Sequence, residues 1–320
     1  MSYLGPDFDP PQPPRSRRRP LLVGLAALVP GALLGWLVYE AVGAPGGTGG
    51  PGRAATVATP TTGSPSARDD GKQPAGSPKP APRPSSAPSS SAPAATGPLK
   101  GKVVVIDPGH NPGNFQHTAA INRQVDIGTN SKECDTTGTS TNSGYTEARF
   151  TLDVARRLRT LLQQQGATVR LTQDGDRPYG PCVDERARIG NTAGADAVVS
   201  IHADGSAQGN RGFHVILPAA VHAGAADTRA IVGPSRDLGE RIAGNFVRVT
   251  GSAPSNYLGD GTGIVTRKDL GGLNLSTVPK VFIECGNMRD SKDEALLTSG
   301  AWRQKAAQGI SEGIVSFLRG

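Results

Sequence analysis

The proline residues of this chain separate it into two parts that cannot share one fold. Nineteen of the 27 prolines lie in residues 1–98 and only eight in residues 99–320. Proline blocks helix interiors and central strands, so the first third cannot build a regular core. Residues 43–98 are almost entirely Gly, Pro, Ala, Ser and Thr, and this composition predicts a disordered linker. We therefore expect one folded domain, at residues 99–320.

Charge and cysteine content exclude several classes of protein. Residues 99–320 carry a formal net charge of only +3, whereas nucleic-acid binding needs a concentrated basic face. Three cysteines are too few for a four-cysteine zinc site and do not suit a disulfide-stapled miniprotein. We expect no nucleic-acid partner, and we expect the chain to act as a monomer.

The amino terminus predicts the location of the protein. Four arginines between residues 15 and 19 precede nineteen uncharged residues, 21–39, which as a helix would be about 28 Å long and could cross a bilayer. We interpret residues 1–20 as a basic cytoplasmic segment and residues 21–42 as a transmembrane anchor. Small residues at 41–44 leave a cleaved signal peptide open. The folded domain is then extracytoplasmic at the cell wall, membrane-anchored in the first case and secreted in the second.

From residue 99 onward, short apolar runs alternate with amphipathic segments. The predicted strands are 102–106, 167–172, 197–201, 213–217 and 280–284, and the predicted helices are 147–165, 183–191, 235–249 and 301–318. This alternation is typical of an α/β fold. We predict a single three-layer domain, with a mostly parallel or mixed sheet and helices on both faces.

Four polar residues are expected at the carboxyl edge of this sheet, where α/β proteins place their sites. His110, His202 and Glu284 follow or end predicted strands, and Glu147 begins a helix on its apolar face. Each has an ordinary explanation alone: a strand-end histidine is often structural, and a first-turn glutamate suits the helix dipole. Together, two imidazoles and one carboxylate would hold Zn²⁺ with an open position, and the other carboxylate would serve as a base.

Five segments of the chain resemble the zinc-dependent N-acetylmuramoyl-L-alanine amidases of the amidase 3 family, over roughly residues 102–318. They are residues 104–110 (VVIDPGH), the helix opening at Glu147, residues 185–191 (ERARIGN), residues 200–204 (SIHAD) and residues 279–287 (PKVFIECGN). The resemblance implies one Zn²⁺ per chain on His110, Glu147 and His202, with Glu284 as the catalytic carboxylate. It implies hydrolysis of the amide between N-acetylmuramic acid and L-alanine, with peptidoglycan or muropeptides as substrate.

Zinc chemistry explains how such a site would cleave an unreactive amide. The ion polarises the carbonyl and acidifies its bound water, the nucleophile, while Glu284 moves the proton as general base and acid.

Two alternatives remain: a zinc peptidase acting on stem peptides, and a non-catalytic wall-binding domain of the same fold. His117 is an alternative first ligand. Cys285 stands where the family often has an apolar residue, and strand alternation points it away from Glu284.

The three cysteines allow three disulfide pairings. We predict a bond between Cys134 and Cys182, because both lie in expected loops and the compartment is oxidising. Cys285 falls inside a predicted strand and is expected to stay a buried thiol. The predicted bond would pin the long loop 111–144 beside His110.

Overall fold

The structure is a computed structural model that describes residues 97–320. The predicted cytoplasmic segment, the membrane segment 21–42 and nearly all of the linker 43–98 lie outside these residues. Within residues 97–320, no helix combines the length and the apolar character needed to cross a membrane.

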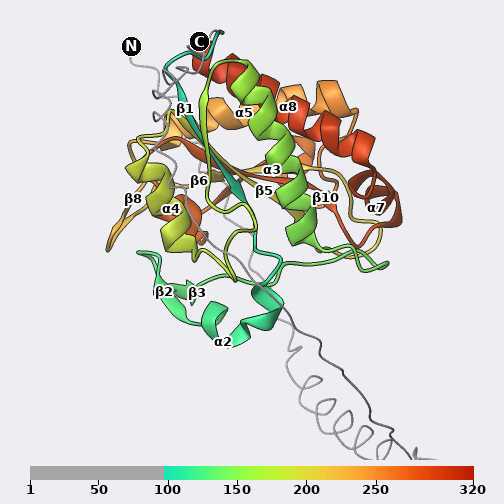
Figure 1. Cartoon of the computed structure of the whole chain (residues 1–320), viewed down its shortest axis with the longest axis horizontal. Helices are drawn as coiled ribbons and strands as arrows, with labels where there is room; N and C mark the ends of the chain where they lie inside the picture. Colours follow the sequence, from blue (N-terminus) through green and yellow to red (C-terminus); the bar gives the residue numbers. More distant parts are fainter. Residues whose placement is uncertain (1–96) are drawn as a thin grey trace, which may run out of the picture. The chain divides into compact units, whose positions relative to one another are not determined.

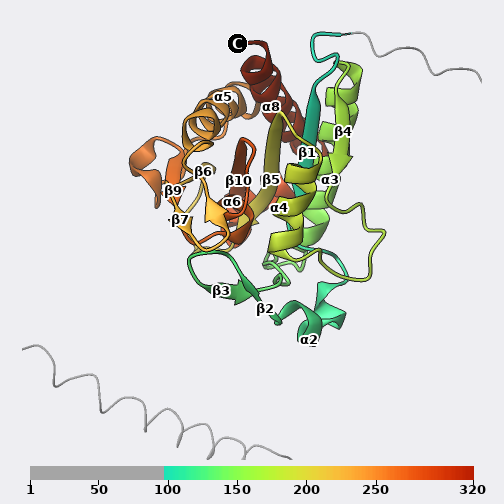
Figure 2. The same ribbon diagram turned by 90° about the vertical axis from the view of Figure 1, so that its left-hand side faces the viewer.

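A six-stranded mixed sheet forms the centre of the domain (Figures 1 and 2). Its strands are β1 (Val103–Pro108), β4 (Thr168–Leu171), β5 (Ala197–Asp204), β6 (His214–Pro218), β9 (Ile264–Arg267) and β10 (Lys280–Asn287). Their spatial order is β4-β1-β5-β10-β6-β9. The pairs are parallel except β10 with β6, which is antiparallel. The predicted mixed α/β sheet is thus confirmed.

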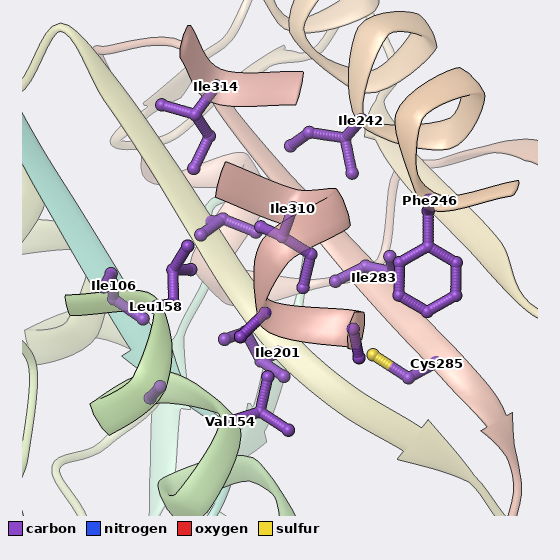
Figure 3. Close-up of a cluster of buried hydrophobic side chains, with 14 of the residues drawn as sticks. Ile106, Val154, Leu158, Ile201, Ile242, Phe246, Ile283, Cys285, Ile310 and Ile314 are labelled. Atoms are coloured by element: carbon purple, nitrogen blue, oxygen red, sulfur yellow. The ribbon is translucent and has the colours of Figure 1, made fainter. Parts of the chain in front are cut away.

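Helices cover both faces of this sheet. The longer ones are α3 (Glu147–Gln164), α4 (Val183–Thr192), α5 (Val232–Thr250) and α8 (Gly300–Arg319). Successive side chains of β1 point to opposite faces of the sheet, which explains the two helical layers. Val104 and Ile106 pack into the core shared with α3, α5 and α8, whereas Val105 packs toward α4. Figure 3 shows the larger core, where Ile106 and Ile201 from the sheet meet side chains of these helices.

Shorter elements surround the sheet. They are η1 (Asn114–Gln116), α2 (Thr118–Ile121), the hairpin β2 (Gln124–Asp126) and β3 (Ser131–Glu133), the hairpin β7 (His222–Ala223) and β8 (Ala226–Asp227), η2 (Gly259–Gly261), α6 (Gly271–Asn274) and α7 (Ser291–Leu297). Figure 1 shows α2, β2 and β3 together at the end of the sheet toward which β1 points. The long loop 111–144 is therefore a structured cover at the carboxyl edge.

The structure extends several predicted elements and adds one central-sheet strand. All five predicted strands are present, but β5 continues to Asp204 and β10 to Asn287, so His202 and Glu284 lie inside strands and not at their ends. α5 begins at Val232, three residues before the predicted start. The prediction omitted β9, which pairs with β6 and forms one edge of the sheet.

The disulfide prediction is confirmed. Cys134 and Cys182 are bonded, and Cys285 is a free, buried cysteine. Cys182 immediately precedes α4, and the Val183 amide donates to the Cys134 carbonyl at 2.8 Å. The bond therefore ties the loop 111–144 to the start of α4.

Candidate metal centre

Four different elements carry the four predicted site residues. His110 follows β1 by two residues, Glu147 is the first residue of α3, and His202 and Glu284 lie on the adjacent strands β5 and β10. The Cα atoms of Glu284 and His202 are register partners, so their side chains leave the same face of the sheet. The fold thus brings all four residues to one end of the sheet.

His110, Glu147 and His202 form a compact cluster of potential metal ligands. One donor atom from each lies within 4.8 Å of the others. His110 Nε2 is 3.1 Å from Glu147 Oε2, and His202 Nδ1 is 3.0 Å from Glu147 Oε1. The two imidazole rings meet edge to face, with centroids 5.0 Å apart. Both imidazoles therefore turn a nitrogen toward one carboxylate.

The carboxylate of Glu147 is nearly enclosed, with only 6% of its side chain exposed. The backbone amides of Thr139 and Ala203 donate to its two oxygens, at 2.9 and 3.2 Å. Burial alone would raise the pKa of Glu147, but His110 and His202 hold that pKa well below its ordinary value. Glu147 is therefore held as an anion between the two imidazoles.

Two glycines make room for this cluster. A Cβ atom at Gly109 would lie 2.2 Å from the His202 ring, and one at Gly138 would lie 2.7 Å from the His110 ring and 2.9 Å from Glu147 Oε2. Gly138 also has a positive φ of 72°, which a side chain would strain. The backbone consequently approaches the imidazoles more closely than any other residue type would permit.

His110 has a left-handed backbone, with φ at 62°, a conformation that costs a non-glycine residue about 1–3 kcal/mol. Its carbonyl accepts hydrogen bonds from Arg186 Nη2 at 2.9 Å and Gln173 Nε2 at 3.1 Å. Its ring Nδ1 lies 3.1 Å from the Thr136 carbonyl and 3.5 Å from Asp135 Oδ1. These contacts leave Nε2 directed at Glu147. Burial opposes the charged form of His110, but Glu147 and Asp135 raise its pKa well above its ordinary value.

A buried ionic network supports the strand that leads to His110. Arg186 reaches Asp107 at 2.7 Å and Asp135 at 2.9 Å, and Lys280 reaches the other oxygen of Asp107 at 3.1 Å. Burial alone would raise the pKa of Asp107, but Lys280 and Arg186 hold it well below its ordinary value. The favourable contribution of Asp107 to stability is therefore present above its unfolded-state pKa near 4 and persists far into acid.

The sequence prediction did not assign roles to Asp107, Asp135, Arg186 or Lys280. One signal was visible, because Asp107 and Lys280 are charged residues directly joined to the apolar runs of two predicted strands. A charge in that position needs a partner. No pattern pointed to Asp135, which reaches Arg186 from a loop 51 residues away in sequence.

Glu284 is partly exposed at the site, yet its Oε2 atom is buried and has no hydrogen-bond partner among residues 97–320. Burial raises the pKa of Glu284 well above its ordinary value, and the nearby carboxylates of Glu147 and Asp204 add to the effect. A carboxyl group that binds a proton readily is suited to acid and base work.

The other residues considered from sequence lie apart from the cluster. The ring of His117 packs against Tyr179, with centroids 5.1 Å apart. Within residues 97–320, His117 is not part of the cluster of potential metal ligands. Cys285 packs in the core shared with α5 and α8 (Figure 3), and strand alternation places Glu284 on the opposite face of β10. A further histidine, His214 on β6, is buried, and its Cα is the register partner of Glu284.

A buried His–Glu–His cluster beside a carboxylate, at the edge of an α/β sheet, defines a candidate metal-dependent hydrolase. The sequence family described as N-acetylmuramoyl-L-alanine amidase, amidase 3, matches residues 104–316. The chain belongs to this family of enzymes, and the resemblance seen in the sequence is confirmed.

Individual relatives agree with this assignment. The chain is 42% identical over 230 residues to the N-acetylmuramoyl-L-alanine amidase Rv3717 of Mycobacterium tuberculosis, covering 71% of this chain and 91% of that protein. It is similar to the crystal structure of the amidase Ami1 from Mycobacterium smegmatis, with a TM-score of 0.63 and 39% identity over 69% of this chain and 98% of that one. Ami1 from Mycobacterium abscessus, solved in its apo form, gives a TM-score of 0.63 at 40% identity, covering 69% and 100% of the two chains.

Proposed function

We propose that this protein hydrolyses the amide between N-acetylmuramic acid and L-alanine in peptidoglycan, using one Zn²⁺ held by His110, Glu147 and His202. The observation that carries the proposal is the convergence of three donor atoms within 4.8 Å, with Glu284 on the adjacent strand. The family match supports the choice of bond.

The residues present fit a zinc ion. The three donor atoms lie within 4.8 Å of one another, close enough for a single ion to contact all of them. Two imidazoles and one carboxylate are a donor set that zinc hydrolases use, and three protein ligands leave a position open. Bound there, Zn²⁺ would polarise the scissile carbonyl and acidify the attacking water.

The protein side chains have separate tasks in this reaction. Glu284 accepts a proton from the attacking water as the new C–O bond forms, and it delivers a proton to the L-alanine nitrogen as the C–N bond breaks. Phe282 stacks on the His202 ring, with centroids 5.0 Å apart and planes at 10°, and so fixes the orientation of that imidazole. Thr136 and Asp135 do the same for His110.

Digestion of purified cell walls tests this function directly. We expect the full-length protein to release whole stem peptides that begin with L-alanine, identified by mass spectrometry. Prior treatment with a chelator should abolish release, and added Zn²⁺ should restore it. Cleavage within the stem peptide would replace the proposal with a zinc peptidase, and wall binding without any product would replace it with a non-catalytic domain.

We further propose that the domain works outside the cytoplasm, held by residues 21–42. The Cys134–Cys182 disulfide supports an oxidising compartment. Amino-terminal sequencing of the membrane-associated protein should find the segment retained. A new terminus near Pro45, with the protein in the medium, would show instead that the segment is a cleaved signal.

A further inference from the structure

A groove beside the metal centre contains the most exposed large apolar side chain of residues 97–320. Phe115 is 65% exposed, whereas the next such residues, Leu258 and Val247, are 42% and 40% exposed. The groove has a volume of about 420 Å³ and also contains Pro112. The exposed ring offers an apolar surface beside the site on which a ligand can stack.

The turn that presents Phe115 is rigidly built. Its neighbour Asn114 is fully buried, donates to the Thr136 carbonyl at 2.7 Å and accepts from the Gly180 amide at 2.9 Å. The Asn111 side chain accepts from the Gly113 amide at 2.8 Å and donates to the Gly180 carbonyl at 2.9 Å. Phe115 is thus an outward-facing ring on a fixed support, which lowers the entropy cost of binding.

The groove is continuous with the metal centre. Gly138 and Thr139 line both the groove and the cavity that contains His110 and Glu284. The turn of Phe115 leads directly into α2, which Figures 1 and 2 place at the end of the sheet where the site lies. A substrate bound at the metal centre can therefore extend along the groove to Phe115.

The two cavities that adjoin the metal centre differ in charge. Apart from Phe115 and Pro112, the groove is lined by hydroxyl, amide and small side chains, and none of its residues is charged. A second cavity, which is also lined by His110 and His202, includes Lys132, Glu133 and Asp269. An uncharged ligand with hydroxyl groups and an apolar face matches the groove, whereas a charged peptide matches the cavity that includes Lys132 and Asp269.

We propose that this groove is a glycan subsite, in which the N-acetylated sugar next to the reacting muramoyl unit stacks on Phe115. The stem peptide, which carries carboxylates and amines, then occupies the side of Lys132 and Asp269. This inference rests on the proposed function, and it makes Phe115 a specificity-determining residue for polymeric substrates.

Two substrates with the same stem peptide test the proposal, one on a single N-acetylmuramic acid and one on a glycan tetrasaccharide. In the full-length protein, Phe115→Ala should lower kcat/KM on the tetrasaccharide about tenfold, because stacking and apolar burial are lost. On the single sugar it should stay within about twofold. Phe115→Trp should retain the preference for the tetrasaccharide, and Val247→Ala, on the distant helix α5, should change neither rate.

Binding of a peptide-free glycan tetrasaccharide provides a readout that needs no turnover. Calorimetry should give a dissociation constant about tenfold higher for Phe115→Ala than for the unchanged protein. Equal losses on both substrates, or no change in either assay, would overturn the glycan subsite. Failure of the unchanged protein to release any stem peptide would overturn the proposed function instead, while the binding assay would still decide the role of Phe115.

Discussion

Glu284→Gln should lower turnover at least ~10²-fold while the protein still binds close to one zinc ion per chain. The loss follows from removing a positioned general base, whose contribution is typically 10²–10⁴-fold. Zinc should remain because His110, Glu147 and His202 are all untouched in this variant. Metal analysis of the purified protein and stem-peptide release from cell walls measure the two quantities.

His202→Ala is the matched comparison. It should lose both zinc and activity, because two protein ligands hold a catalytic ion poorly. It should also be the less stable variant, because Glu147 then keeps its buried position with one imidazole fewer. Near-normal turnover in Glu284→Gln would mean that another residue is the base, and loss of zinc there would mean that Glu284 is itself a ligand.

Arg186→Met should destabilise the fold by about 3–5 kcal/mol, the usual result of removing one partner from a buried ionic network. Asp107 and Asp135 would both lose their bond to the guanidinium, and the His110 carbonyl would lose a donor. Because these contacts position His110, zinc affinity should fall about 10–100-fold as well. Urea unfolding with a zinc titration gives both values.

Arg188→Met provides the control for this experiment. Arg188 lies on the same helix α4, but its side chain is 67% exposed, and its ion pair with Glu185 spans 3.7 Å. A surface pair of this kind contributes at most about 1 kcal/mol. If the two variants were equally stable, the buried network would not be what holds the carboxyl end of β1.

Most of the sheet could be predicted because its strands are strongly apolar. The sequence is almost entirely apolar around Val104, Val198 and Val281. Each of these runs is more apolar than a helix or loop of the same length would be. β9 has no such run, since it lies at the sheet edge and is partly exposed along its length. The β2–β3 hairpin pairs only three residues per strand, mostly polar, and its position depends on the rest of the domain.

The candidate site likewise contains residues that could be predicted from sequence and residues that could not. His110, His202 and Glu284 could be found because they adjoin recognisable strands, and Glu147 because it begins a clear helix. The residues that orient them were not predictable in this way. Asp135 and Arg186 come from a loop and a helix, and only the folded chain brings them to His110.

Gly109 has a consequence for how related sequences are interpreted. It carries no reactive group, yet a single methyl group there would overlap the His202 imidazole. A relative could therefore keep both histidines and both glutamates and still lose its activity by drift at this one backbone position. Whether a homologue is an active or an inactive enzyme should be judged from the glycines that make room for the imidazoles as well as from the polar residues themselves.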